Sequence, residues 1–276
     1  MTDERDGGES QSVAQSWRRW EPMFQSFSWP LALRMAAVGE VGSGQRVLDV
    51  GCGIGDPTLQ VAVLVGPHGH VLGLDIVEGK IAIARERAAT LGLGHAEFRV
   101  EDVTAVALPE AGFDVVLGRW SLIYLDDVAG VLDRLRAALV PGGRIAITAW
   151  APPEASPCFS VPLEAIARVR RLPPLGADQP GLFHLSTDGA LARALVGAGF
   201  QTVGQERVVL SQLAQDGAEF WRLMTDPGAP LAPFIEDLAP AQVGAVAEDV
   251  AARLERYRAG DVLRVPAQAQ LAWGRA

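Results

Sequence analysis

The chain has 276 residues, of which 49% are hydrophobic and 21% are charged, and its formal net charge is −9 at pH 7. This composition is typical of a globular protein that buries a full core, and it argues against a disordered chain. The negative charge and the lack of a basic stripe argue against a nucleic-acid partner, because polyanions are bound through clustered Lys and Arg.

Residues 1–38 are predicted to form an N-terminal tail followed by a helical cap. Residues 1–12 are polar and contain Gly and Ser, a composition typical of a disordered terminus. Residues 13–38 follow a helical pattern that is rich in aromatic side chains. We expect Pro22 and Pro30 to interrupt this helix, because proline lacks the backbone N–H that the helix interior needs.

Strand and helix patterns alternate from residue 39 to residue 150. Short apolar runs indicate buried strands, and the longer stretches of helical pattern between them indicate helices. This alternation implies βαβ units with right-handed crossovers and a parallel sheet covered on both faces. The strands predicted over the whole chain are residues 46–50, 70–75, 96–100, 113–118, 144–150, 201–210 and 262–275.

The regular alternation stops after residue 150. Residues 151–186 are rich in proline, and a later helical stretch is broken by several prolines. We expect one sheet domain over residues 39–276, with inserted lid segments at about 151–186 and 213–260. Helices broken by proline and joined by loops are the kind of segment that opens and closes over a site.

The cysteine and histidine residues indicate neither a disulfide framework nor a metal site. Cys52 and Cys158 are the two cysteines, and the four histidines are dispersed along the chain. The polar N-terminus is unlike a signal peptide, and Gly, Pro or charged residues interrupt the apolar runs before they reach the length of a membrane span. We therefore expect a cytoplasmic protein with no metal and no membrane association.

A glycine-rich loop directly follows the first predicted strand and precedes a predicted helix. Glycine lets the backbone turn tightly and approach a ligand, and the helix N-terminus attracts a carboxylate or phosphate. The second strand ends in Asp75, whose carboxylate can accept hydrogen bonds from both hydroxyls of a ribose. The loop residues that we expect at a nucleoside cofactor are Asp49, Gly51, Cys52, Gly53 and Gly55.

The spacing of the glycines distinguishes between nucleoside cofactors. The dinucleotide fingerprint has a glycine at its sixth place, where this chain has Asp56. A carboxylate there repels a pyrophosphate, which disfavours a nicotinamide oxidoreductase. The pattern suits S-adenosylmethionine, because its carboxylate can meet the helix N-terminus, and its ammonium and sulfonium groups tolerate Asp49 or Asp56.

Five sequence motifs, in order and at characteristic spacing, resemble class I S-adenosylmethionine-dependent methyltransferases. The motifs are RVLDVGCGIGDPTLQVA, GHVLGLDI, AEFRVEDV, FDVVLGRWSL and PGGRIAITAW. The resemblance is strong over residues 40–150 and weak over 187–275, and it is closest to quinone-biosynthesis and bacterial natural-product enzymes. It implies an α/β, Rossmann-like, doubly wound sheet of seven mostly parallel strands with an antiparallel last strand.

The resemblance also assigns cofactor-binding residues. Asp75, followed by Ile76, is expected to bind the ribose, and Asp102 with Val103 is expected to flank the adenine. Arg119 is expected under the methionine moiety, although a surface ion pair is the structural alternative. The cofactor would be S-adenosylmethionine and the product S-adenosylhomocysteine.

Two residues of the glycine loop have structural alternatives of their own. Asp49 either contacts the cofactor or hydrogen-bonds the loop amides. Cys52 is expected to act as a small residue packed at the loop rather than as a nucleophile. Both alternatives leave the glycines themselves as the part of the loop that approaches the ligand.

Methyl transfer from a sulfonium is an in-line displacement that demands alignment and exclusion of water. A general base is needed only where the acceptor carries a proton that the reaction removes. His184 and Tyr124 are candidates for this role. The structural alternative for His184 is a residue that precedes a helix cap, and the alternative for Tyr124 is a packing residue.

The aromatic side chains of the cap and lid segments indicate the acceptor. Apolar pockets with few polar anchors bind small molecules, although many of these rings also pack the core. We expect methyl transfer to O, N or C of a small, largely apolar or aromatic acceptor of a quinone-like or natural-product kind. The alternative is a protein that binds S-adenosylmethionine without methylating, such as a sensor. The predicted pocket residues are Trp20, Phe24, Trp150 and Phe183.

Overall fold

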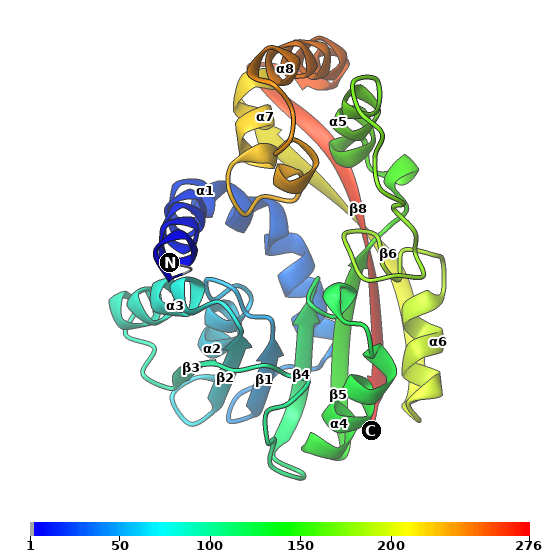
Figure 1. Cartoon of the computed structure of the whole chain (residues 1–276). Helices are drawn as coiled ribbons and strands as arrows, with labels where there is room; N and C mark the ends of the chain where they lie inside the picture. Colours follow the sequence, from blue (N-terminus) through cyan, green and yellow to red (C-terminus); the bar gives the residue numbers. More distant parts are fainter. Residues whose placement is uncertain (1–2) are drawn as a thin grey trace. The chain divides into compact units, whose positions relative to one another are not determined.

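The computed structural model describes residues 3–276, with side chains described at Val13 and from Gln15 onward. Its central sheet has the strand order β3-β2-β1-β4-β5-β8-β6, and a short strand β7 pairs with β8 (Figure 1). The strands are β1 (Arg46–Val50), β2 (His70–Asp75), β3 (Ala96–Val100), β4 (Phe113–Arg119), β5 (Leu139–Trp150), β6 (Gln201–Ala214), β7 (Arg258–Ala259) and β8 (Val262–Arg275).

The strand directions confirm the predicted doubly wound sheet. β1 is parallel to β2 and β4, β2 is parallel to β3, and β4 is parallel to β5. β8 is antiparallel to β5, as expected for the last strand. The two-residue strand β7 is the one addition to the predicted strands. The strand order reverses at β1 and β4, and ligands bind at the carboxyl ends of strands at such a point.

Helices fill the connections between the strands. The α-helices are α1 (Asp3–Val38), α2 (Thr58–Val65), α3 (Glu78–Thr90), α4 (Val128–Ala138), α5 (Pro157–Ala167), α6 (Ala190–Gly197), α7 (Gly217–Thr225) and α8 (Pro240–Leu254). The short 3-10 helices are η1 (Leu122–Tyr124), η2 (Pro153–Ala155), η3 (Ala232–Phe234) and η4 (Glu255–Tyr257).

The N-terminal segment differs from the prediction. Helix α1 is continuous, so the predicted tail at residues 1–12 is helical from residue 3, and the first two residues lie outside the described part. Lengthening an existing helix costs far less than starting one, which allows it to extend through polar sequence. The helix also continues through Pro22 and Pro30, each of which already has a helical φ. Fully buried residues such as Met35 stabilise its C-terminal half.

The chain divides into two compact units, whose boundaries cross α1, β6 and β8. Of the described residues, unit 1 comprises 3–28, 152–176 and 209–268, and unit 2 comprises 29–151, 177–208 and 269–276. Helices α5, α7 and α8 pack together within unit 1, whereas unit 2 holds the β1–β4 region of the sheet (Figure 1). The role of the inserted segments as lids stays a prediction. None of the helices in the described part of the chain combines the length and apolar character that a membrane crossing requires.

Candidate functional site

The glycine loop follows β1 and is tied to the end of β2. The backbone N–H groups of Gly51 and Cys52 both donate to the Leu74 carbonyl, at 2.7 and 2.9 Å. Gly51 has φ of 71°, and a Cβ built there would lie 2.3 Å from Cβ of Ser121, so no side chain fits. Gly53 has φ of 57°, and beyond its two chain neighbours no atom of the described chain lies within 4 Å of a Cβ built on it. The loop therefore leaves open space above Gly53.

Asp75 anchors this loop as well as ending β2. Its Oδ2 accepts a hydrogen bond from the Gly53 N–H at 2.9 Å, and its Oδ1 accepts one from the Val77 N–H at 2.9 Å. Each carboxylate oxygen has a further lone pair, so the side chain can still accept from ribose hydroxyls. Ile76 is 69% exposed next to it. A bound nucleoside would cover this exposed apolar surface.

Asp49 is fully buried at the carboxyl end of β1, with 0% exposure. Its Oδ2 accepts a hydrogen bond from the Thr58 hydroxyl at 2.5 Å, rather than from the loop amides. Its Oδ1 has no hydrogen-bond partner among residues 3–276. Burial raises the pKa of Asp49 to about 6, and the Thr58 hydrogen bond and the Arg119 charge oppose the rise. The carboxylate is thus incompletely paired in the protein alone.

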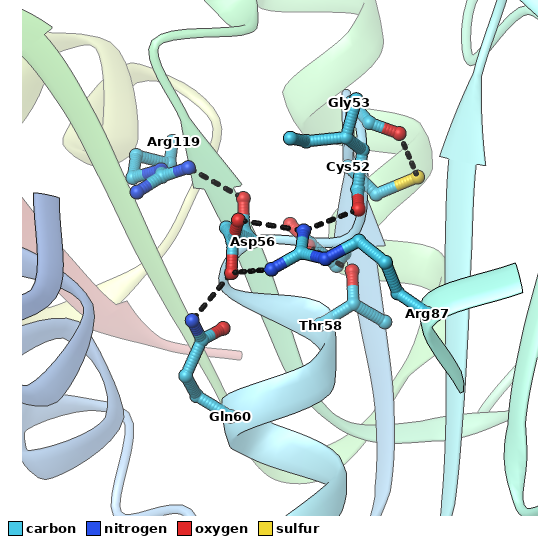
Figure 2. A network of polar contacts seen from close by, with 9 residues as sticks. Cys52, Gly53, Asp56, Thr58, Gln60, Arg87 and Arg119 are labelled. Atoms are coloured by element: carbon cyan, nitrogen blue, oxygen red, sulfur yellow. Dashed lines mark hydrogen bonds and ion pairs between the residues drawn. The ribbon is translucent and has the colours of Figure 1, made fainter. Parts of the chain in front are cut away.

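Asp56 forms a buried ion pair rather than a helix cap. Arg87 donates to Oδ2 of Asp56 at 2.9 Å and to the Ile54 carbonyl at 2.6 Å (Figure 2). Helix α2 begins at Thr58, and no side chain caps its N-terminus. Because Arg87 neutralises Asp56, Asp49 is the acid with an unpaired carboxylate oxygen in the loop.

Arg119 ends β4 and faces the same loop. Its Nη2 donates to the backbone carbonyl of Asp56 at 2.6 Å, as Figure 2 shows, while its Nη1 is buried and finds no acceptor in the described chain. Burial lowers the pKa of Arg119, and the charges of Asp56 and Asp49 partly offset this. The guanidinium is therefore not a surface ion pair. It presents one unpaired cationic donor beside Asp49.

Asp102 and Val103 follow β3, where the adenine is predicted. Oδ1 of Asp102 accepts from the N–H and hydroxyl of Thr104, at 2.8 and 2.7 Å, and these bonds hold the pKa of Asp102 below its usual value. Neither bond uses Oδ2. The Asp102 side chain is exposed, whereas Val103 is buried. The carboxylate is thus available to an amine from solvent.

The thiol of Cys52 points into the core. It packs in an apolar cluster with Leu59, Ile81 and Phe98. Burial and the negative charge of Asp49 raise the pKa of the thiol well above its ordinary value. A neutral, buried thiol is a poor nucleophile, which agrees with the expectation of a packing role.

The two candidate bases lie at the segment that follows β4, where Tyr124 is part of η1 and His184 contacts its backbone. Nδ1 of His184 lies 3.1 Å from the Ile123 carbonyl, so Nδ1–H donates and Nε2 carries the basic lone pair. The Gly181 N–H donates to the same carbonyl at 2.9 Å, which holds the His184 loop on η1. Tyr124 belongs to η1 and is 58% exposed. The structure brings both residues to the carboxyl side of β4.

The four predicted pocket aromatics are not gathered in one unit. Trp20 and Phe24 belong to unit 1, where Trp20 donates to Oδ2 of Asp226 at 2.8 Å. Trp150 and Phe183 belong to unit 2, and both are buried. Trp20 is also buried, whereas Phe24 is only partly buried. The contact of these four residues with an acceptor stays a prediction.

Trp120 and Ser121 follow Arg119 directly and were not predicted as site residues. Trp120 has φ of 54° and its ring stacks on Trp150, with centroids 4.1 Å apart and planes 12° apart. The Oγ atom of Ser121 is buried and has no hydrogen-bond partner within residues 3–276. Their position after the fourth strand was a usable signal, since side chains there face the ligand edge of a parallel sheet.

Comparisons with known proteins identify the family. A family model described as a methyltransferase domain matches residues 42–168. Aklanonic acid methyltransferase of Streptomyces sp. strain C5 is 36% identical over 157 residues, which cover 54% of this chain and 71% of that protein. Nocamycin O-methyltransferase of Saccharothrix syringae is 34% identical over 186 residues, which cover 64% and 66%.

Among solved structures, the cyclase SpnF superimposes with a TM-score of 0.56 at 22% identity, covering 96% of this chain and 95% of that one. At this identity the likeness shows the fold alone. The sequence relatives, by contrast, are methyltransferases, and the loop lacks the sixth glycine of a dinucleotide site. The chain therefore belongs to the S-adenosylmethionine-dependent methyltransferases.

Proposed function

We propose that this methyltransferase acts on a small, largely apolar or aromatic acceptor of the natural-product kind, and that the ends of β1 and β4 bind the amino acid end of its cofactor. The two sequence relatives support the acceptor class, because they are named for methyl transfer involving aklanonic acid and nocamycin. No nucleic-acid partner is expected, because the chain carries a net charge of −9.

The observation that supports the cofactor placement most strongly is a pair of unpaired atoms of opposite charge. Oδ1 of Asp49 and Nη1 of Arg119 are buried without partners among the described residues. A buried polar group left unsatisfied costs about 1–3 kcal/mol, and more when it is charged. An amino acid end offers an ammonium group for Asp49 and a carboxylate for Arg119, so it satisfies both atoms at once.

The nucleoside end is proposed to lie along the ends of β2 and β3. Asp75 holds the Gly53 and Val77 amides and would accept the ribose hydroxyls with its remaining lone pairs. The exposed side chain of Ile76 would provide apolar surface for the adenine, and Oδ2 of Asp102 would accept its amine. The contact of the buried Val103 with the adenine stays a prediction. When bound, the cofactor supplies a methyl group already activated on a sulfonium.

His184 is proposed as the general base where the acceptor carries a proton. The Ile123 carbonyl fixes the Nδ1–H tautomer and leaves Nε2 able to take a proton. Tyr124 is the second candidate, because it is held on the same segment after β4. An acceptor whose attacking atom carries no proton needs neither residue.

The test is incubation of the purified protein with methyl-deuterated S-adenosylmethionine and a panel of small apolar and aromatic acceptors. Mass spectrometry should find labelled acceptor and S-adenosylhomocysteine rising together with time. A variant His184→Gln should slow transfer to hydroxyl acceptors while cofactor affinity is kept. If the protein binds the cofactor but forms no product with any acceptor, the non-methylating alternative is supported and the proposal fails.

A further inference from the structure

The hydroxyl of Ser121 is a buried polar group beside the proposed cofactor site. Its Oγ has no hydrogen-bond partner within residues 3–276, although a hydroxyl can donate one bond and accept two. Buried hydroxyls in proteins are nearly always hydrogen-bonded, so an unpaired one calls for a ligand or another specific explanation.

Ser121 lies between the carboxyl ends of β1 and β4. A Cβ built on Gly51 would be 3.3 Å from Oγ of Ser121, and a Cβ built on Gly118 would be 3.2 Å from it. Gly51 directly follows β1, and Gly118 lies within β4. These two strands flank the point where the strand order reverses, which is where an open α/β sheet binds its ligand.

The backbone before Ser121 is held in an unusual conformation that fixes its position. Trp120 has φ of 54°, a left-handed value that is rare for a bulky residue. Its N–H donates to Oγ1 of Thr148 at 3.0 Å, and its ring stacks on Trp150. Such strain persists where the surrounding structure over-determines it, and it is concentrated at functional sites.

The charges of Asp49 and Arg119 indicate which group of the cofactor the Ser121 hydroxyl binds. Asp49 offers an unpaired anionic acceptor, and Arg119 offers an unpaired cationic donor, both within the described chain. Asp49 matches an ammonium group. The carboxylate of the same amino acid end requires hydrogen-bond donors, and Nη1 of Arg119 is one donor atom that has no partner in the described chain. We propose that Ser121 is a cofactor-binding residue whose hydroxyl donates a hydrogen bond to the cofactor carboxylate beside Arg119. This inference rests on the proposed placement of the amino acid end.

The variant Ser121→Ala removes Oγ and leaves the backbone unchanged. Isothermal calorimetry compares its affinity for S-adenosylhomocysteine, which carries the amino acid end, with that for methylthioadenosine, which lacks it. A hydrogen bond to a charged group corresponds to about a tenfold change in affinity or more. We expect the affinity for S-adenosylhomocysteine to fall by about tenfold and that for methylthioadenosine to stay unchanged. Ser26→Ala makes the same change at an exposed serine of α1, whose hydroxyl donates to the Met23 carbonyl at 3.0 Å, and is the control.

A third ligand, decarboxylated S-adenosylmethionine, separates the carboxylate from the ammonium. Its affinity should be the same for Ser121→Ala and the wild type. An equal fall for all three ligands would reveal a structural role, and an unchanged affinity for S-adenosylhomocysteine would show that the hydroxyl does not touch the cofactor. Either result overturns the inference. Failure of the wild-type protein to distinguish S-adenosylhomocysteine from methylthioadenosine would instead refute the proposed placement of the amino acid end.

Discussion

Replacing Asp49 by Asn tests the electrostatics of the buried carboxyl at the end of β1. Burial raises the pKa of Asp49 to about 6, whereas an unfolded Asp has a pKa of about 3.9. The folded state therefore binds the proton more tightly, so the free energy of unfolding falls as pH rises from about 4 to about 6. With about 1.4 kcal/mol for each pKa unit, the loss is about 3 kcal/mol.

Asparagine has the same shape and can still accept the Thr58 hydrogen bond, but it carries no charge. The free energy of unfolding of Asp49→Asn, relative to the wild type, should therefore rise by about 3 kcal/mol between pH 4 and pH 7 and then level off. Urea unfolding without cofactor, followed by circular dichroism at several pH values, measures this difference.

The matched control is Asp126→Asn, which removes an exposed carboxyl from the same unit. Its effect on the free energy of unfolding should vary much less with pH. A difference between Asp49→Asn and the wild type that is flat across the pH range, or that falls as pH rises, would refute the reasoning. Either result would mean that burial does not penalise the charged form of Asp49 as the structure implies.

Three further predictions concern cofactor binding. Asp75→Ala should lower the affinity for S-adenosylhomocysteine at least tenfold, because charge-assisted hydrogen bonds contribute about 1.5–3 kcal/mol each. The circular dichroism spectrum should stay unchanged. An unchanged dissociation constant would place the ribose elsewhere. Gly51→Ala should abolish cofactor binding and should lower the thermal stability more than Gly44→Ala does. Both glycines have positive φ, but only a Cβ at Gly51 would clash with Ser121, at 2.3 Å. An equal loss of thermal stability in the two variants would contradict the close approach. The affinity of the wild type for S-adenosylhomocysteine should rise between pH 5 and pH 7, because the ammonium binds ionised Asp49, and calorimetry should find a weaker pH dependence for Asp49→Asn.

The sheet and the cofactor loop could be predicted from the sequence because their signals are local. The apolar run RVLDV, which is followed by glycine, identifies β1, and the run HVLGLD, which ends in Asp75, identifies β2. The antiparallel direction of β8 came from the resemblance to a family, since no local pattern fixes the direction of the last strand. The continuity of α1 could not be predicted, because the proline rule is overridden where packing compensates for the lost hydrogen bond.

The polar contacts of the site depend on residues far apart in the chain. Arg87 pairs with Asp56 across 31 positions, and nothing in the sequence distinguishes this arginine from the many exposed ones. The left-handed conformation of Trp120 has no sequence signal either, because glycine and asparagine are the residues that usually mark it. Only the folded backbone brings the hydroxyl of Ser121 to Gly51.

A crystal structure of the complex with S-adenosylhomocysteine tests the placement of the cofactor most directly. The account predicts the ammonium group within hydrogen-bond distance of Oδ1 of Asp49 and the carboxylate within reach of Nη1 of Arg119 and Oγ of Ser121. It also predicts the ribose on Asp75. An amino acid end that points away from the ends of β1 and β4 and leaves these three atoms unpaired would contradict it.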